Sequence, residues 1–101
     1  MAPDTTTRDP GLLVLVSLAG GPKHGHAIFR DVAAFSGERL GPGTLYGALS
    51  RLEETGLIEA MAPDGRRRPY RLTDAGSAAL RARLAGLGAA VKTGQERLAS
   101  A

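Results

Sequence analysis

The segment that most constrains the fold is GPGTLYGALSRLEETGLIEA, residues 41–60, in which a helical pattern passes directly into a strand pattern. Gly41 followed by Pro42 is typical of a helix start, because proline at the first helical position loses no hydrogen bond. Gly56 is suited to the left-handed conformation that ends a helix. Leucines at helical spacing predict the buried face of this helix: Leu45, Leu49 and Leu52.

An earlier helix is predicted to begin at Pro10, with Asp9 as its cap, and to stop at Gly20-Gly21-Pro22. The run between these limits, GLLVLVSLA, is apolar on every side of a helix, so it must be covered on more than one face. We expect a second subunit to supply part of this cover. The expected dimer contacts on this helix are Leu12, Leu15 and Val16.

The next helix is predicted within KHGHAIFRDVAAFSG. Ile28, Val32 and Phe35 are spaced by four and three residues, which puts them on one face of an amphipathic helix. Gly37 again suits a left-handed helix end. In the link that follows, Leu40 is expected to form a minimal strand.

After the third helix the sequence period becomes that of a strand. Pro63-Asp64-Gly65 is predicted to form the turn between two short strands. In the second strand, Tyr70 and Leu72 alternate with Arg71, so we expect the first two side chains to face the core. Pro69 cannot donate a hydrogen bond to a neighbouring strand, which indicates an edge strand or a bulged hairpin.

A last helix is predicted after a cap formed by Thr73 and Asp74. Gly86, Gly88 and Gly94 lower its helix propensity by roughly 1 kcal/mol each relative to alanine, so we expect it to need a partner. Apolar residues at alternating spacings of four and three, with Gly94 at the one step that lacks an apolar side chain, predict a dimer contact along it. These residues are Leu80, Leu84, Leu87, Val91 and Leu98.

The composition limits the classes of function. The chain has 101 residues, a net charge of +3, no cysteine and no tryptophan. This length fits one domain, and the positive charge suits an anionic partner. The absence of cysteine agrees with a reducing cytoplasm, and the longest apolar run is far shorter than the roughly 20 residues that span a membrane. We expect a cytoplasmic protein with no membrane partner and no cofactor.

The order of elements predicts a mainly α protein with a small β-hairpin, a winged helix-turn-helix followed by a C-terminal dimerisation helix. Residues 1–8 are polar without periodicity and are expected to be a disordered tail. We assign residues 9–72 to the DNA-binding unit and residues 73–101 to the dimerisation helix. Such a fold suits double-stranded DNA, because a helix fits the major groove while a basic hairpin reaches phosphates.

The expected DNA contacts lie on the outward face of the third helix and at the hairpin tip. Small residues let DNA approach closely, and Thr, Tyr and Arg can donate hydrogen bonds to phosphates. The helix candidates are Gly43, Thr44, Tyr46, Gly47, Ser50 and Arg51. The hairpin candidates are Arg66, Arg67 and Arg68. Tyr46 lies near the edge of the buried stripe, so we expect a packed ring with its hydroxyl on a phosphate.

Three stretches resemble the PadR family of bacterial transcriptional regulators: LLVLVSLAGGPKHGHAI, GPGTLYGALSRLEETGLIEA and GRRRPYRLTDAG. The resemblance covers residues 12–80, and the single last helix is similar to the short subfamily. It implies a homodimeric repressor on a pseudo-palindromic operator, with dimer contacts from the first and last helices. Lys23 and His24 match the start of the family's second helix and join the expected DNA contacts.

Three positions depart from the family pattern: His26, Gly41 and Gly47. His26 stands where the family commonly has tyrosine, which leaves the role of that position open. Gly41 is itself an acceptable cap and should cost only a few tenths of a kcal/mol. Family members often respond to small aromatic or drug-like compounds at or near the dimer interface. Whether this protein has such an effector stays open.

Other readings compete with these assignments. The arginine run could simply keep an exposed hairpin soluble, although its position at a turn tip favours phosphate contact. His24 and His26 could begin a metal site, but further ligands would be needed and no cysteine is present. No set of nucleophile and base is suggested, so we do not expect an enzyme. The alternative function is a winged-helix module that binds protein or RNA without operator specificity.

Overall fold

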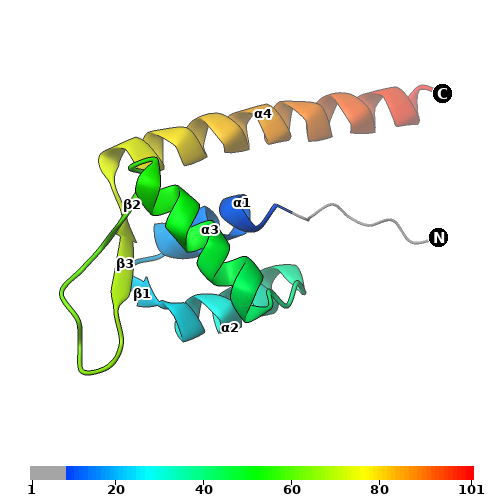
Figure 1. Ribbon diagram of the computed structural model, residues 1–101. Helices are drawn as coiled ribbons and strands as arrows, with labels where there is room; N and C mark the ends of the chain where they lie inside the picture. The colour runs from blue at the N-terminus through cyan, green and yellow to red at the C-terminus, as the bar shows by residue number, and fades with distance from the viewer. Residues whose placement is uncertain (1–8) are drawn as a thin grey trace.

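Figure 1 shows the architecture of residues 9–101, the part of the chain that the computed structural model describes. Its elements are α1 (Pro10–Ala19), β1 (Lys23–His24), α2 (Gly25–Ser36), α3 (Pro42–Glu54), β2 (Ile58–Ala60), β3 (Pro69–Leu72) and α4 (Asp74–Ala99). The predicted tail, residues 1–8, lies outside the described residues. The predicted fold class, a winged helix-turn-helix with a long C-terminal helix, is confirmed. None of the helices in residues 9–101 combines the length and apolar character that a membrane span requires.

Local signals set the helix boundaries where the sequence predicted them. α1 begins at Pro10, and the Asp9 carboxylate accepts a hydrogen bond of 3.0 Å from the Leu12 N–H. α3 likewise starts at a proline. Gly37 and Gly56 both adopt φ +78° just after α2 and α3. Glycine takes this left-handed conformation without steric cost, which explains why the helices end there.

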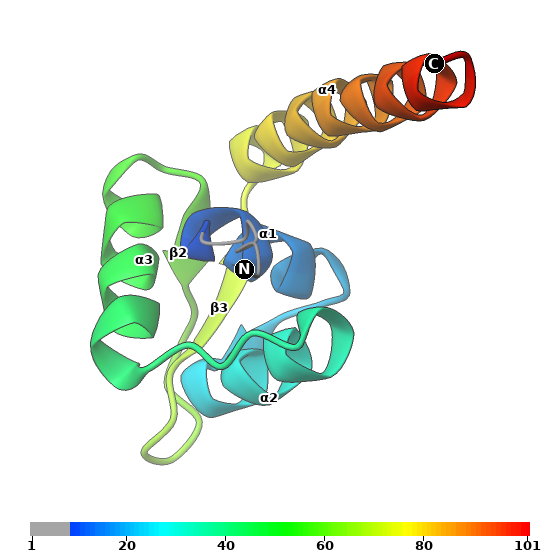
Figure 2. The same cartoon turned by 90° about the vertical axis from the view of Figure 1, so that its right-hand side faces the viewer.

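The chain itself covers most of α1, a helix that the sequence predicted to be covered in part by a second subunit. α1 packs against α2, α3, β3 and α4 (Figure 2). Leu15, predicted at the dimer interface, is only 6% exposed and belongs to the core. Leu12 and Val16 are partly buried against the same core. The all-round apolar pattern therefore belongs to the central helix of the fold.

The sheet contains a third strand that the sequence did not predict. β1 pairs antiparallel with β3, which also pairs with β2, in the order β1-β3-β2. Of the two alternatives predicted from Pro69, an edge strand or a bulged hairpin, the edge strand is wrong, because β3 is central. Pro69 is the first residue of β3, and its carbonyl accepts a 2.8 Å hydrogen bond from the Met61 N–H. Leu40, predicted as a minimal strand, is in no strand and is buried in the core.

The hairpin between β2 and β3, residues 61–68, is the wing, and its tip is centred one residue later than predicted. Asp64 and Arg67 exchange two backbone hydrogen bonds of 2.7 and 3.1 Å, so Gly65 and Arg66 are the central turn residues. Gly65 has φ +66°, a value that two-residue hairpin turns favour and that glycine adopts readily. The turn therefore places Arg66 and Arg67 at the far end of the wing.

The apolar face of α2 is only partly covered. Ile28 and Val32 are fully buried, but Phe35 is 46% exposed. The packed core contains no residue of α2 beyond Val32. Phe35, in the last turn, therefore extends past the core that the earlier turns fill.

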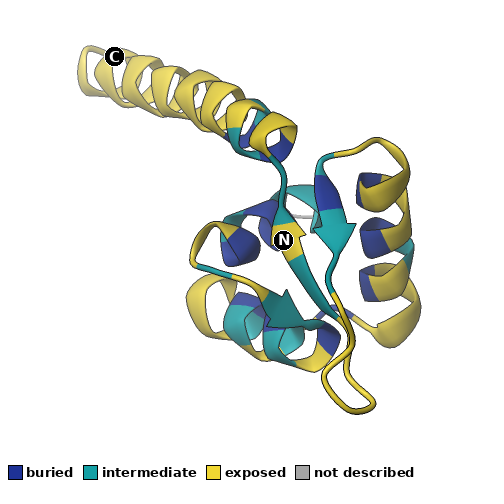
Figure 3. Cartoon of the chain, turned by 90° about the vertical axis from the view of Figure 1, so that its left-hand side faces the viewer, coloured by how far each residue is buried: buried dark blue, intermediate teal, exposed yellow. Residues whose placement is uncertain are grey.

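α4 is anchored at its start and projects from the body along most of its length (Figures 1 and 3). The Thr73 side chain caps it by accepting a hydrogen bond from the Gly76 N–H. Leu80, predicted at the dimer interface, is buried in the chain's own core. From Arg81 onward every residue of the helix is exposed. The stripe available to a partner therefore begins later than predicted, at Leu84.

An ion pair joins α4 to the start of α1. The guanidinium of Arg83 contacts the Asp9 carboxylate, whose other oxygen caps α1. Partial burial raises the pKa of Asp9, but the hydrogen bonds from the Leu12 N–H and from Arg83 outweigh it and hold the pKa below its ordinary value. Asp9 is therefore ionised at neutral pH, and the stabilisation from this group is lost as the pH falls through its lowered pKa.

Gly76→Ala should lower the free energy of unfolding by roughly 1–3 kcal/mol, the usual effect of overpacking. An added Cβ would overlap the Leu57 carbonyl oxygen and lie 2.9 Å from its carbon, and this backbone cannot rotate away. Gly86→Ala on the same helix is the matched control, because nothing lies within 4 Å of its added Cβ. Gly86→Ala should raise the free energy of unfolding by up to about 1 kcal/mol. Urea unfolding measures both, and equal effects would contradict this packing of α4 on Leu57.

Candidate nucleic-acid interface

α3 presents two contrasting faces. Its inner face is buried and consists of Leu45, Ala48, Leu49 and Leu52. Its outer face carries the predicted DNA contacts, of which Gly47 is half-buried and the others are exposed: Gly43, Thr44, Tyr46, Ser50 and Arg51. Small residues on the outer face leave room for a nucleic-acid backbone, and the hydroxyl and guanidinium groups can donate to phosphates or base edges.

A hollow of about 380 Å³ lies where α3, the start of α2 and the wing meet. It is lined by His24, Gly25, His26, Tyr46, Arg66, Arg67, Arg68 and Tyr70. We call it the arginine-lined hollow. Predicted DNA contacts from three separate segments come together there, and no carboxylate is among the lining residues. Such a concentration of cations attracts a polyanion, since it raises the local positive potential.

The wing arginines differ in how freely they can bind a ligand. The Arg68 guanidinium donates a 3.4 Å hydrogen bond to the Met61 carbonyl, which holds it along the hairpin. Within residues 9–101, the side chains of Arg66 and Arg67 form no hydrogen bond or ion pair. These two guanidinium groups are exposed and available to an incoming anion.

Tyr46 packs over the first residue of α2. A Cβ added to Gly25 would overlap the Tyr46 hydroxyl oxygen and lie 2.9 Å from Cζ, so only glycine leaves room for this ring. Tyr46 is still 51% exposed. The ring is thus fixed from one side and open on the other, as expected for a packed ring with an accessible hydroxyl.

Sequence reasoning missed three residues of the arginine-lined hollow as site residues: Gly25, His26 and Tyr70. Gly25 could have been found from its position between His24 and His26 at the predicted helix start, because a glycine there leaves space for a neighbouring side chain. Tyr70 was expected to face the core, and it does pack against the core. Burial raises the pKa of Tyr70, with the Glu53 carboxylate adding to the rise, so its phenol stays protonated at neutral pH.

Lys23 does not lie with the other predicted DNA contacts. Its ammonium donates hydrogen bonds to the carbonyls of Ser17 at 2.5 Å and Gly21 at 3.3 Å, and lies 4.0 Å from the Asp31 carboxylate. The Ser17 hydroxyl also donates to Asp31, at 2.7 Å. Ser17 belongs to α1, Gly21 to the turn after it, and Asp31 to α2. The Lys23 ammonium therefore holds the end of α1 and this turn against α2.

His24 caps α2. Its Nδ1 accepts a hydrogen bond of 3.3 Å from the Ala27 N–H. The sequence match put His24 at the start of the second helix, and in the structure it is the cap, one residue before Gly25. His26 lies in the first turn, stacked on Phe29 with the ring centroids 6.0 Å apart. Among residues 9–101, no group of three or more His, Cys, Asp or Glu side chains is arranged to hold a metal ion. His24 thus has a structural role that needs no metal.

These features define a winged helix-turn-helix of the nucleic-acid-binding type, with a small-residue recognition face beside a cationic wing. Residues 14–82 match the model of the transcriptional regulator PadR-like family. The match covers more than half of the chain, and the chain belongs to this family. The family consists of transcriptional regulators and not of enzymes.

Individual relatives agree with this assignment. The chain is 44% identical over 72 residues to a transcriptional regulator of Mycobacterium tuberculosis, covering 68% of this chain and 66% of that protein. It is 53% identical over 70 residues to a 37.1 kDa protein in a transposon of Streptomyces fradiae, covering 69% of this chain. The match spans only 20% of that second relative's length.

A solved structure shares most of this arrangement. The chain superposes on a PadR family transcription regulator from Clostridium difficile with a TM-score of 0.79 and 26% identity. The superposition covers 88% of this chain and 97% of the other. The long C-terminal helix therefore falls largely within a shared architecture.

Gly25→Ala should weaken binding to duplex DNA about three- to tenfold, the worth of one hydrogen bond, because the added Cβ displaces Tyr46. Tyr46→Ala should have a similar effect. The double variant should bind no more weakly than Tyr46→Ala alone, since Gly25 acts through that ring. Anisotropy of a labelled duplex measures binding, and thermal unfolding checks the fold of Gly25→Ala. Additive losses would show that Gly25 acts by another route.

Proposed function

We propose that the protein is a sequence-specific, homodimeric transcriptional repressor that binds a pseudo-palindromic DNA operator in the cytoplasm. The observation that carries DNA binding is the continuity of the exposed outer face of α3 with the arginine-lined hollow, through Tyr46. Membership of a family of transcriptional regulators supports this choice over an enzyme or a structural protein.

In the proposed complex, α3 enters the major groove and the wing lies on the DNA backbone. α3 has 13 residues, or about 20 Å at 1.5 Å per residue, which suits the groove. Thr44, Ser50 and Arg51 face the bases or flanking phosphates. Arg66 and Arg67 contact phosphates, since their guanidinium groups have no partner among the described residues.

A second copy of the chain is the proposed cover for α4. The exposed stripe on this helix consists of Leu84, Leu87, Val91 and Leu98, which are 42–79% exposed. Large apolar side chains gathered on one face of a projecting helix indicate an interaction surface, because water solvates them poorly. A two-fold dimer through α4 would present two copies of α3 to two half-sites of an operator. Of the three α1 residues expected at the dimer contact, Leu12 and Val16 retain exposed surface and Leu15 is buried.

The alternative is a winged-helix module that binds protein or RNA without operator specificity. A mobility-shift assay on the DNA upstream of the protein's own gene, with random duplex as competitor, separates the two. A discrete complex that survives competition supports the repressor, and equal loss on every nucleic acid supports the alternative. Reporter transcription from the same DNA, with and without the protein, then tests repression against activation.

Changing both Arg66 and Arg67 to alanine should weaken binding to the upstream duplex and to random duplexes by similar factors. It should also lower the slope of log K against log salt by roughly one to two units, about one per lost phosphate contact. Binding titrations at several salt concentrations measure this slope.

Two controls sharpen this experiment. Arg81 and Arg97 on α4 are exposed arginines outside the hollow, so changing both to alanine removes the same charge and should leave the slope nearly unchanged. Ser50→Ala should instead alter the preference among operator point variants. If the wing variant keeps the wild-type slope, the wing does not contact phosphates.

Leu84→Asp should convert the dimer to a monomer at micromolar concentration. Each subunit would bury an unpaired carboxylate, and the two-fold axis brings the two charges together. Ala82→Asp adds the same charge on the opposite, exposed face of α4 and should leave the dimer intact. Light scattering measures the mass of both variants. A monomeric wild type, or a dimeric Leu84→Asp, would contradict this interface.

A further inference from the structure

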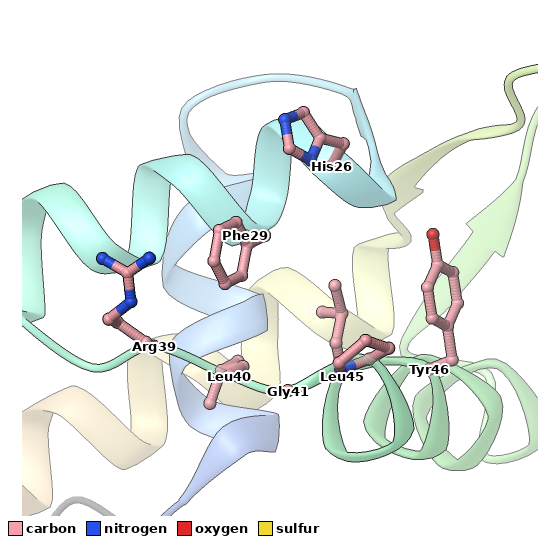
Figure 4. Close-up of a pocket in the computed structure, with 8 residues that line it drawn as sticks. His26, Phe29, Arg39, Leu40, Gly41, Leu45 and Tyr46 are labelled. Carbon is pink, nitrogen blue, oxygen red and sulfur yellow. The ribbon is translucent and has the colours of Figure 1, made fainter.

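His26 lies where two hollows of the surface meet. It lines the arginine-lined hollow, and it also lines a neighbouring hollow of about 440 Å³ between α2, the link to α3 and the first turns of α3 (Figure 4). In Figure 4 its ring lies above Phe29 at the start of α2, and Tyr46 rises from α3 toward the same end of that helix. His26 is exposed, so its side chain lies beside the surface that DNA would use.

The His26 ring is held by one of its faces. It stacks on Phe29 with an interplanar angle of 22°, and Phe29 in turn packs against the core. Within residues 9–101, neither ring nitrogen of His26 forms a hydrogen bond or an ion pair. Phe29 thus positions the imidazole, while both of its nitrogens stay available to a ligand.

His24, the other histidine of the chain, is not free in the same way. Its Nδ1 caps α2 by accepting the Ala27 N–H. A proton on this nitrogen would turn the acceptor into a donor and break the cap, because both nitrogens of a charged imidazole are donors. A proton on His26 breaks no hydrogen bond of the described residues. Of the two histidines, His26 is therefore the one that can gain a charge without loss to the fold.

The charged side chains around His26 are arginines. They are Arg66, Arg67 and Arg68 from the wing, Arg39 from the link between α2 and α3, and Arg30 one turn further along α2. Tyr46 and Tyr70 add hydroxyl groups from α3 and β3. Among the described residues no carboxylate lines either hollow, and both Glu53 on α3 and Asp64 on the wing lie outside them. A phosphate that enters the arginine-lined hollow would therefore be the anion with which a protonated His26 can pair.

We propose that His26 is a further DNA contact, made by its imidazolium, so that each protomer takes up a proton from the solvent as it binds DNA. This inference rests on the proposed function. α2 precedes the recognition helix, and in a helix-turn-helix the preceding helix crosses the DNA backbone. A ring N–H of His26 donates to a backbone phosphate there, and the opposite charges strengthen the hydrogen bond. The phosphate favours the charged ring over the neutral one, and the proton leaves again when the DNA dissociates.

Proton uptake makes DNA binding depend on pH. Because the complex holds more protons than the free protein and DNA, the affinity should rise as the pH falls, by up to about tenfold per pH unit for one proton. Histidine ordinarily changes charge between about pH 5 and pH 8, and the chain has no cysteine. Anisotropy of a labelled random duplex, at constant salt between about pH 6 and pH 8, measures the affinity of the full chain. Calorimetric titrations in phosphate and in Tris, buffers of different ionisation enthalpy, count the protons taken up.

Two substitutions at His26 separate its charge from its ring. His26→Tyr keeps an aromatic ring and a hydrogen-bond donor but cannot gain a positive charge, so it should lose most of the rise in affinity at low pH. His26→Arg is charged at every pH, so its affinity should change little between about pH 6 and pH 8 and exceed that of wild type at the upper end. His24→Asn keeps a side-chain acceptor for the cap of α2 and should retain the wild-type dependence on pH. The amino group at the chain end is common to all four proteins.

Each of three results would overturn the role of His26: wild-type binding that is independent of pH, a His26→Tyr variant with the wild-type pH dependence, or loss of that dependence in His24→Asn instead. In each of these cases the protein still binds DNA, so the proposed function stands. A wild-type protein that binds neither the random nor the upstream duplex at any of these pH values would overturn the proposed function, and this inference with it. Thermal unfolding of the variants checks that each is folded.

Discussion

The structure depends on burying α1, an apolar helix with no polar side, within a single chain. α2 and α3 cover part of it, and β3 and α4 return from later in the sequence to cover the rest. Its one buried polar side chain, Ser17, is 1% exposed and donates its hydroxyl to Asp31, so burial leaves no unsatisfied group. Because α2, α3, β3 and α4 all pack on α1, the recognition helix and the wing are held on one core.

Much of this arrangement could be predicted from local chemistry. Proline and glycine act through backbone geometry alone, and the predicted starts at Pro10 and Pro42 and the left-handed ends at Gly37 and Gly56 are all found. β1 could not be predicted, because two residues contain no period, and the strand exists only through its pairing with β3. The long-range return of β3 and α4 to α1 left no local signal, so the sequence could not show that the chain itself buries most of this helix, Leu15 included.

The candidate site was predictable to the extent that it lies on one helix and one turn. The outer residues of α3 follow from its leucine stripe, since the opposite face of an amphipathic helix is exposed. Lys23 does not join the other expected DNA contacts, because its ammonium is bound by Ser17 and Asp31, which the fold brings to it from α1 and α2. The contact of Tyr46 with Gly25 likewise joins two helices, and only the fold shows that this tyrosine lines the arginine-lined hollow.

The anchoring of α4 ties the proposed dimer to the proposed DNA-binding face. The contacts that fix its direction all precede the exposed stripe: Gly76 packs on Leu57, Leu80 enters the core, and Arg83 pairs with Asp9. A two-fold dimer through α4 would therefore set the distance between the two copies of α3. That distance must match half-sites about one DNA turn, or roughly 34 Å, apart. A change in the angle at which α4 leaves the body would alter the operator spacing without touching a DNA contact.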